Sequence, residues 1–456
     1  MKIAIGVVLI AAVAEMATAQ SKAGDFEVSP LPRQGQGVPR MRVAAREAVP
    51  DGIRPCQTNI CSTTRPSTCL EVSFPETAWR TCISNQGRRG LVLGPTDLRR
   101  DPGGPWMRIL REAAVAEIFV PYDSFLGLRL YDHETTSAQS IREVTPADAG
   151  RNGSVVTLSG QSVPQVVAEL NDRGIAWLCK EGKSISRRGQ EMVLWGVQDA
   201  ANYDFIIEYR LRDDGSIGMR LGATGFNNPY FPPNSTTAAH MHDVLWRIDI
   251  DLNGAAGDSA VQWKHVETAA TRLHSQDVEE PFNGGVEGVV RWDPKTFYTI
   301  GVVDNSVNAY GNRIGYALRV APAGGVSRHF GEAEGLLRRE RFTQSDFAVT
   351  VFRQSERDAM FDSAHVRYLQ PDQYLLGEEG FEGMGVSNAE PVTNTDVVLW
   401  YRSAVHHHPH DEDRAPGDPS SLMTGITNVH WQGVDLEPRN LFDFNPLGGP
   451  SRAQCQ

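Results

Sequence analysis

The amino-acid sequence predicts a mainly β protein, built as a large antiparallel β-sandwich with few short helices. Short runs of β-branched and aromatic residues recur from about residue 71 to the C-terminus, and turn-forming residues separate them. The 456 residues include 43 Gly and 27 Pro, which suits a fold with many tight turns. A chain of this length can form a single large β domain.

The runs that predict strands have a common composition of Val, Ile, Phe, Tyr and Trp. They read DFIIEYRL, SIGMRLGAT, DVLWRIDIDL, FYTIGVV, FAVTVFR and DVVLWYR. The segment RLRDDGSIGMRL places an Asp-Gly pair between two of them and predicts a hairpin with a tight turn.

Helical patterns are few. WMRILREAAVAEIF (106–119) has the composition of a helix, and SVPQVVAELNDRG (162–174) predicts a helix that ends at Gly174.

The N-terminus has the pattern of a secretory signal. A lysine precedes an apolar run that ends at Ala14, and an Ala-Thr-Ala cleavage site ends at Ala19. The apolar run has about 12 residues, against the ~20 that a membrane-spanning helix needs. We expect a signal peptide at 1–19, an extended cysteine-containing segment at 20–70 and the β-sandwich at 71–456. The location is then secreted or periplasmic.

Export permits disulfide bonds, and four of the six cysteines crowd into one short stretch: Cys56, Cys61, Cys69 and Cys82. Four cysteines allow three pairings, so the connectivity stays open. Cys179 and Cys455 either pair with each other or remain free. Zinc ligation by the four N-terminal cysteines is the alternative, although neither Cys-x-x-Cys spacing nor a neighbouring histidine is present.

The formal net charge of -12 argues against a nucleic-acid partner and is compatible with attraction of cationic small molecules. Beyond the N-terminal run, the sequence has no segment typical of a membrane span. We therefore expect a small-molecule partner, no nucleic acid and no membrane.

Two groups of histidines could hold a metal ion. His240 and His242 lie two apart in a predicted strand, so both side chains point to the same face. The segment AVHHHPHDED could add one more imidazole from His406, His407, His408 or His410. Imidazole ligands suit copper, zinc, iron or nickel. The alternatives are surface placement for the first group and a solvated polar loop for the second.

Carboxylates form a third group. Asp249-Ile250-Asp251 alternates acidic and apolar residues, and Asp396 opens the predicted strand DVVLWYR. Carboxylate and backbone carbonyl oxygens are the ligands of a hard cation such as calcium. Ordinary turn aspartates are the alternative.

Taken in chain order, these groups and the segment DAANYDFIIEY resemble the copper amine oxidases that carry topaquinone. The quinone of that family arises from the tyrosine of an Asn-Tyr-Asp/Glu motif, which is Asn202-Tyr203-Asp204 in this sequence. DDGSIGMRLGATG is similar to the family's following hairpin, AEIFVPYD to its AE-x-x-VPYG segment, and LEPRNLFDFNP to its closing segment. The resemblance covers roughly residues 71 to 446.

The resemblance implies oxidative deamination of primary amines to aldehydes, with dioxygen as acceptor and release of ammonia and hydrogen peroxide, by a homodimer. Copper would be held by His240, His242 and His407, the last within the family's H-x-P-x-x-E-D pattern. Tyr203 would be the topaquinone precursor, to which the amine attaches as a Schiff base. Tyr122 and Asn202 would hold the quinone ring in position.

The family's calcium pattern implies a further site. It comprises Asp249, the Ile250 carbonyl, Asp251, Asp396 and the Val397 carbonyl.

The sequence departs from the family pattern at three places. The proton-abstracting base of the family lies in a Y-x-D-x-G pattern, whereas LRLYDHETT offers Asp132 without the glycine, and Asp123 is the alternative. Asp199 stands where the family has a threonine before the tyrosine, and Phe205 stands at the family's aromatic position two residues after it. A second interpretation is therefore a secreted, non-catalytic copper-binding or adhesion homologue. A zinc hydrolase using the same histidines would leave the Asn-Tyr-Asp motif unexplained.

Overall fold

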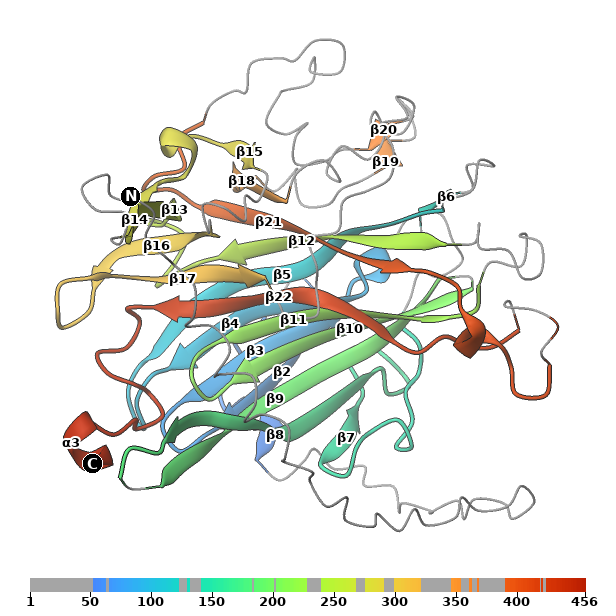
Figure 1. Ribbon diagram of the computed structural model, residues 1–456, viewed down its shortest axis with the longest axis horizontal. Coiled ribbons are helices and arrows are strands. Elements are labelled where there is room, and N and C mark those ends of the chain that lie inside the picture. Colours follow the sequence, from blue (N-terminus) through green and yellow to red (C-terminus); the bar gives the residue numbers. More distant parts are fainter. Residues whose placement is uncertain are drawn as a thin grey trace, which may run out of the picture. The chain divides into compact units, whose positions relative to one another are not determined.

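Two ten-stranded antiparallel sheets face each other and enclose one large apolar core (Figure 1). The computed structural model describes residues 52–62, 65–122, 129–131, 141–182, 184–200, 202–227, 239–267, 275–290, 299–320, 346–353, 361–362, 367–368, 390–418, 420 and 424–456. These residues belong to a compact unit, Ala45–Gln456. The predicted β-sandwich is confirmed, and α3 (Arg452–Cys455) is the single α-helix among the described residues.

The first sheet has the order β1-β2-β3-β4-β5-β12-β21-β18-β15, with β6 pairing to β5. Its strands are β1 (Ile53–Pro55), β2 (Thr68–Ser73), β3 (Ala78–Asn85), β4 (Leu91–Arg99), β5 (Trp106–Pro121), β6 (Arg129–Tyr131), β12 (His240–Ile250), β15 (Gly288–Val290), β18 (Phe347–Val351) and β21 (Val397–His407). Strand β1 and the first residues of β2 lie within the segment 20–70. The end of that segment therefore belongs to the sheet.

The second sheet has the order β14-β13-β16-β17-β22-β11-β10-β9-β8-β7. Its strands are β7 (Gly153–Val156), β8 (Val166–Cys179), β9 (Ile185–Ala200), β10 (Tyr203–Arg212), β11 (Ile217–Gly225), β13 (Ser259–Glu267), β14 (Ser275–Pro281), β16 (Thr299–Val307), β17 (Arg313–Val320) and β22 (His430–Arg439). A separate small sheet pairs β19 (Phe361–Asp362) with β20 (Arg367–Tyr368). Short 3₁₀ turns are η1 (Gly87–Arg89), η3 (Phe282–Gly285) and η5 (Asp411–Asp413).

Both predicted helices are wrong, because the first segment lies in a strand and the second enters one at Val166. The segment 106–119 lies in β5, which sits between β4 and β12 and is buried over most of its length. A central strand covered on both faces reads as a nearly continuous apolar run, so its Ala and Leu residues mimic a helix. The segment 162–174 enters β8, where Gly174 has φ +91° and lies at a break in register rather than at a helix end.

The predicted hairpin is confirmed between β10 and β11. The Gly215 N–H donates to the Arg212 carbonyl, and the Arg212 N–H donates to the Ser216 carbonyl. Gly215 has φ +84°, which explains the need for glycine at this position. The turn fixes the register that runs from Leu211–Ile217 to Tyr203–Gly225.

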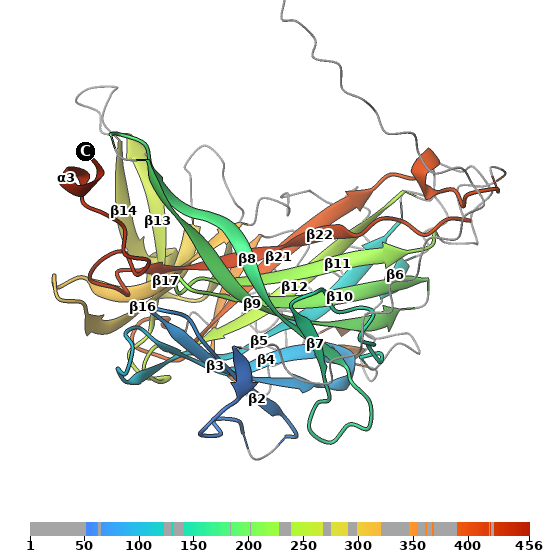
Figure 2. The ribbon, with the colours of Figure 1, turned by 90° about the horizontal axis from the view of Figure 1, so that it is seen from below.

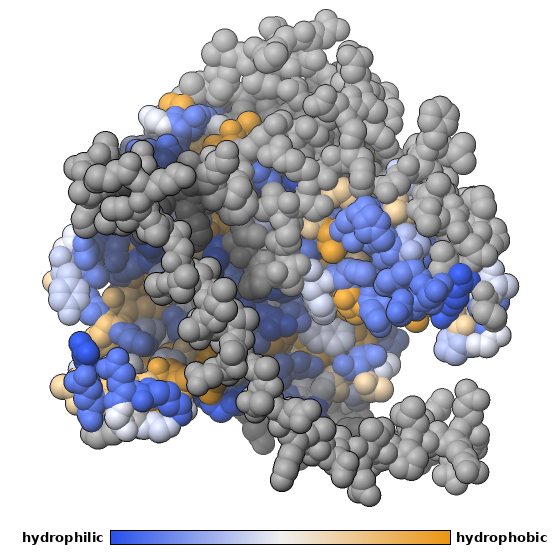
Figure 3. Space-filling view, in the orientation of Figure 1, coloured by the Kyte–Doolittle hydropathy of each residue, from blue (hydrophilic) through white to orange (hydrophobic). Residues whose placement is uncertain are grey.

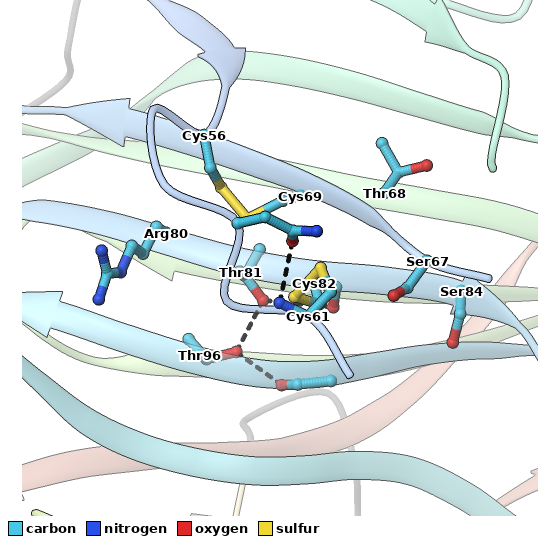
Figure 4. The surroundings of a disulfide bond; sticks show 12 residues. Cys56, Cys61, Ser67, Thr68, Cys69, Arg80, Thr81, Cys82, Ser84 and Thr96 are labelled. Atoms are coloured by element: carbon cyan, nitrogen blue, oxygen red, sulfur yellow. Dashed lines mark hydrogen bonds between the residues drawn. A yellow bond between two sulfur atoms is a disulfide. The ribbon is translucent and has the colours of Figure 1, made fainter. Parts of the chain in front are cut away.

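Disulfide bonds join all six cysteines. The pairs are Cys56–Cys69, Cys61–Cys82 and Cys179–Cys455, with Cα separations of 5.4, 5.5 and 6.2 Å. The first two fasten the chain before β2 to the β2–β3 hairpin (Figure 4). Because these thiols are bonded to each other, the alternative of a four-cysteine zinc site is wrong.

The third disulfide joins the end of β8 to α3, and Figure 2 shows the tip of the long β8–β9 pair beside the C-terminus.

Apolar and polar residues are interspersed over the described part of the face in Figure 3. Among the described residues, no helix has the length and apolar character to cross a membrane.

Candidate metal centre

The antiparallel pair of β12 and β21 positions three histidines. His240 lies directly opposite His407 in the register. His240 and His242 lie two apart on β12, which is buried along its whole length, so both imidazoles face the interior. The ring centroid of His240 lies 4.8 Å from that of His242 and 5.0 Å from that of His407. The predicted three-histidine group is thus brought together.

Tyr203 reaches this group from the other sheet. It begins β10, is buried, and places its hydroxyl oxygen 3.1 Å from His240 Nε2 and 3.1 Å from His407 Nδ1. Its ring centroid lies 4.7 Å from that of His242. A phenol oxygen therefore lies between two imidazole nitrogens at the meeting point of the two sheets.

His242 provides a test of whether these residues fit a metal ion. The side chain is fully buried, and neither ring nitrogen has a hydrogen-bond partner. Leaving a buried polar group without a partner costs about 1–3 kcal/mol, so such groups are rare unless another ligand satisfies them. Burial lowers the pKa of His242 well below its ordinary value, and the neighbouring His240 and His407 add to this. The neutral imidazole offers the lone pair that a metal requires.

The Asp413 carboxylate orients His407. Asp413 Oδ2 accepts a hydrogen bond from His407 Nε2 at 3.0 Å and one from the His410 backbone N–H at 3.0 Å. This bond places the proton on Nε2 and leaves the Nδ1 lone pair facing Tyr203. Burial lowers the pKa of His407 to about 4, although Asp413 acts in the opposite direction. A carboxylate that fixes a histidine tautomer in this way is typical of metal centres.

A second group, on the outer side of His407, has ligand atoms within 4.8 Å of one another: His407, His410 and Asp413. Here the facing atoms already contact one another, because His410 Nδ1 lies 3.1 Å from Asp413 Oδ2 and His407 Nε2 donates to the same oxygen. The His410 side chain is also 54% exposed. The unpartnered, buried nitrogens of His242 favour the inner group as the metal centre.

Aromatic and small residues enclose Tyr203. Phe205 stacks near it with ring centroids 6.4 Å apart, and Tyr122 lies against His240 at 4.6 Å. Asn202 Nδ2 donates to the Phe226 carbonyl at 2.6 Å. Gly225 pairs with Tyr203 at φ +153°, and a Cβ there would lie 2.2 Å from the Asn202 carbonyl oxygen. Only glycine allows β11 to approach the Asn-Tyr-Asp segment so closely.

Asp199, which departs from the family pattern, belongs to a charged group on the outer face of the second sheet, whereas Tyr203 points inward. Asp199 lies directly opposite Asp204 in the β9–β10 register, and Arg142 forms an ion pair with Asp199. Burial raises the pKa of Asp204, while the charge of Arg142 opposes the rise.

The predicted calcium residues converge at the opposite end of the same two strands. Ligand oxygens of Asp249, Asp251 and Asp396 lie within 4.8 Å of one another. Asp249 Oδ2 is 3.2 Å from Arg247, and Asp396 Oδ2 is 3.2 Å from Arg111. One oxygen of each of the three carboxylates is buried without a hydrogen-bond partner. Backbone carbonyls of Ile250 and Val397 belong to the same strand ends.

The predicted base, Asp132, and its alternative, Asp123, lie outside the described residues. Sequence reasoning missed two residues beside the centre. Gln432 Nε2 donates to the His242 carbonyl at 3.0 Å, and the ring of His430 lies 4.7 Å from that of His407. The signal was present in VHWQGVDLEP, where alternate positions from 430 to 436 form one face of a strand.

Comparison with known proteins identifies relatives of this arrangement. The family described as copper amine oxidase, enzyme domain, matches residues 171–454. Primary amine oxidase 1 of Arabidopsis thaliana is 24% identical over 427 residues, covering 81% of this chain and 61% of that protein. The primary amine oxidase of Arthrobacter sp. (strain P1) is 21% identical over 401 residues, covering 81% and 58%.

Solved structures share the fold. The Aspergillus nidulans amine oxidase matches with a TM-score of 0.63 and 17% identity, over 93% of this chain and 56% of that one. A copper-containing benzylamine oxidase from Hansenula polymorpha matches with a TM-score of 0.60 and 17% identity, over 86% and 64%. The chain spans about three fifths of the length of the curated relatives.

Replacing Asp413 tests the orientation of His407. Asp413→Asn should weaken copper(II) binding by roughly 10- to 100-fold, because the His407 tautomer is no longer fixed by a carboxylate. A competition titration with a copper chelator measures the change. Glu412→Gln is the matched control, since the neighbouring Glu412 side chain is 74% exposed. Equal affinities in the two variants would contradict the orienting role.

Proposed function

Because this chain belongs to the copper amine oxidase family, we propose that it oxidises primary amines to aldehydes with copper and topaquinone, releasing ammonia and hydrogen peroxide. The observation that carries the proposal is the Tyr203 hydroxyl, which lies 3.1 Å from His240 Nε2 and from His407 Nδ1. A metal-binding histidine group in contact with a buried tyrosine is the arrangement that a self-derived quinone requires. A zinc hydrolase does not account for this tyrosine.

His240, His242 and His407 would hold the copper. When bound, copper would supply the oxidation of the Tyr203 ring by dioxygen, and the quinone would supply an electron sink for the oxidation of the amine by dioxygen. Burial keeps His242 and His407 neutral at pH 7, so their lone pairs are available without loss of a proton. Asp413 holds His407 in the orientation that points Nδ1 at Tyr203.

The remaining residues would orient the ring and move a proton. Phe205 and Tyr122 restrict the space around Tyr203 and His240, and the hydrogen bond from Asn202 to Phe226 fixes the start of β10. Asp132 would take the proton from the carbon next to the amine nitrogen. A carboxylate does this efficiently when burial raises its pKa toward neutrality.

The second candidate is a secreted homologue that binds copper without turnover. The sequence around the predicted base favours it, because LRLYDHETT lacks the glycine of the family's Y-x-D-x-G pattern. Peroxide release with a panel of primary amines distinguishes the two candidates: release supports the oxidase, and its absence in a copper-loaded, quinone-containing protein supports the homologue.

Location and assembly complete the proposal. Three disulfide bonds are compatible with an oxidising, extracytoplasmic compartment, as the proposed signal peptide would require. The active form would be a homodimer, by the resemblance to the family. A calcium ion would bind the carboxylates of Asp249, Asp251 and Asp396, with the carbonyls of Ile250 and Val397.

Replacing Tyr203 tests the origin of the quinone. Copper-loaded wild-type protein should show a visible quinone band and react with phenylhydrazine, whereas Tyr203→Phe should show neither, because the ring lacks the oxygen at which oxidation begins. Tyr316→Phe is the matched control, since Tyr316 is a fully buried tyrosine of the same sheet, in β17, whose hydroxyl donates to the Gly215 carbonyl. A band that persists in Tyr203→Phe would overturn the assignment.

Replacing Asp132 separates quinone formation from turnover. Asp132→Asn should keep the quinone band and the reaction with phenylhydrazine, while amine-dependent peroxide release falls by about 10²-fold or more, because a general base contributes on this scale. Asp123→Asn, measured in parallel, should retain activity. The reverse result would assign the base to Asp123.

Calcium binding predicts a pH-dependent stabilisation. Burial raises the pKa of Asp249 to about 7 and that of Asp396 to about 6, so the cation-free protein loses stability as pH rises from about 4 to about 7. At pH 8 the carboxylates are charged and repel one another, and calcium offsets this repulsion. At pH 5 calcium has little effect, because the carboxyl groups of Asp249 and Asp396 are largely protonated. Thermal unfolding with calcium or with EGTA at both pH values measures this, and magnesium is the control cation. A Tm at pH 8 that is indifferent to EGTA would count against the calcium site.

A further inference from the structure

A pair of buried aspartates lies at the end of the β13–β16 ladder. Asp258 directly precedes β13, and Asp304 lies in β16. The register pairs Ser259 with Val303, so its continuation by one residue sets Asp258 opposite Asp304. Opposite residues of an antiparallel pair carry their side chains on the same face, with Cβ atoms ~4.5–5.5 Å apart. The two carboxyl groups are therefore neighbours.

Both side chains point toward the interior of the sandwich. Ala260 and Val302, each two residues further along its strand, belong to the apolar core, and alternate residues of a strand share a face. Asp258 is fully buried, and Asp304 is 5% exposed. The ladder therefore carries two carboxyl groups at the end of a face that continues with apolar residues.

No cationic side chain compensates this pair. Among the described residues, neither Asp258 nor Asp304 forms an ion pair, whereas arginines lie beside the carboxylates of the candidate calcium group. A buried carboxylate without a partner of opposite charge is costly, and two carboxylates that face each other repel. A proton or a bound cation must therefore neutralise the pair.

Each carboxylate keeps one oxygen for a further ligand. Asp258 Oδ2 accepts a hydrogen bond from the Leu252 N–H at 3.3 Å, whereas Asp258 Oδ1 is buried and has no hydrogen-bond partner. Asp304 Oδ1 accepts from the N–H and the hydroxyl of Ser306. Within the described part of the chain, Asp304 Oδ2 accepts no hydrogen bond. One oxygen from each side of the ladder is thus available.

Gly257 leaves room beside Asp304 Oδ2. A Cβ at this position would lie 3.1 Å from that oxygen, closer than an ordinary van der Waals contact. Gly257 also has φ +109°, a conformation that residues with a side chain rarely adopt. The glycine therefore lets the chain turn into β13 and keeps the space next to Oδ2 open.

The electrostatics favour a positive ion at this position. Burial raises the pKa of Asp258 to about 9, the charge of Asp304 adds to the rise, and the hydrogen bond from Leu252 opposes it. Asp251 and Asp396 raise the pKa further. Without a cation, Asp258 therefore holds a proton at pH 7. Calcium, which binds carboxylate oxygens, can take the place of that proton.

We propose that Asp258 and Asp304 bind a calcium ion at a site separate from the group of Asp249, Asp251 and Asp396. Neither residue is among the carboxylates that lie within 4.8 Å of one another in that group. Asp258 Oδ1 and Asp304 Oδ2 would be the carboxylate ligands. Burial favours calcium over magnesium, because magnesium gives up its water ligands reluctantly. The proposal goes beyond the amine oxidase function and does not depend on it.

An ion at this site would fasten the two sheets together. The Asp258 carbonyl accepts the Thr395 N–H at 2.8 Å, and the Asp258 carboxylate accepts the Leu252 N–H. Thr395 lies two residues before β21 and Leu252 two residues after β12, both in the first sheet, whereas β13 and β16 belong to the second. Calcium would therefore stabilise the contact between the sheets at this end of the sandwich.

Calorimetric titration of the whole, EDTA-treated protein with calcium at pH 8 tests the proposal. The wild-type protein should bind one calcium ion more than Asp258→Asn or Asp304→Asn. Asp396→Asn should retain this ion. Asp443→Asn is the matched control, because Asp443 is exposed and its carboxylate also accepts a backbone N–H. This variant should bind as many calcium ions as the wild type.

Proton release gives a second readout, which needs no variant. At pH 8 the carboxyl groups of Asp249 and Asp396 are already largely ionised, since their pKa values are about 7 and about 6, whereas that of Asp258 is protonated. Calcium binding by the wild-type protein should therefore release about one proton at this pH. Titrations in buffers of different ionisation enthalpy measure the release.

Equal calcium stoichiometry in the wild type, Asp258→Asn and Asp304→Asn would overturn the proposal, and so would calcium binding at pH 8 without proton release. If Asp258→Asn fails to fold, the proton release of the wild type decides. Failure of the calcium group at Asp249, Asp251 and Asp396 has a different signature. In that case a single ion binds, and it is retained in Asp396→Asn and lost in Asp304→Asn.

Discussion

The register between β12 and β21 is the constraint on which the site depends. It sets His240 opposite His407 and, three positions along β12, brings Asp243 within reach of Arg402. That ion pair is buried, with a 2.7 Å bond from Arg402 Nε to Asp243 Oδ1. Shifting the pairing by one residue would turn every side chain of one strand to the other face. It would also leave buried charges unpaired, which makes the slip costly.

The second sheet completes the site because contacts between the sheets fix its position. The Tyr209 hydroxyl donates to the backbone carbonyls of Leu91 and Ala113, and Gln432 donates to that of His242. These bonds join side chains of one sheet to the backbone of the other. Tyr203, six residues before Tyr209 and on the same face of β10, is thereby held against the histidines. The close approach of Gly225 removes the remaining freedom at this end of the strand.

How much the sequence could predict depended on whether a feature is local. Strands such as Tyr203–Arg212 and the turn at Gly215 follow from nearby residues, and so does the shared face of His240 and His242. The predicted helix at 106–119 failed because burial of β5 on both faces is set by β4 and β12, not by its own composition. The disulfide pairing could not be predicted from the sequence, because it too depends on which segments of the fold lie next to each other. The strand face of His430 and Gln432 follows from the alternation in VHWQGVDLEP, but its position beside the histidines follows from the sheet order β22-β11-β10, which no local pattern reveals.

The two candidate metal groups lie at opposite ends of the β12–β21 ladder. His242 and Asp249 are seven residues apart on β12, a separation of about 23 Å at the usual rise of ~3.3 Å per residue. Two unit charges this far apart interact by only ~0.7 kcal/mol at an effective dielectric constant of ~20, so direct charge interaction between the groups is weak. Any influence of the carboxylates on the histidines must therefore pass through the ladder itself. A cation at the carboxylates would stabilise the strand ends, and the paired strands would keep His240 opposite His407 at the other end.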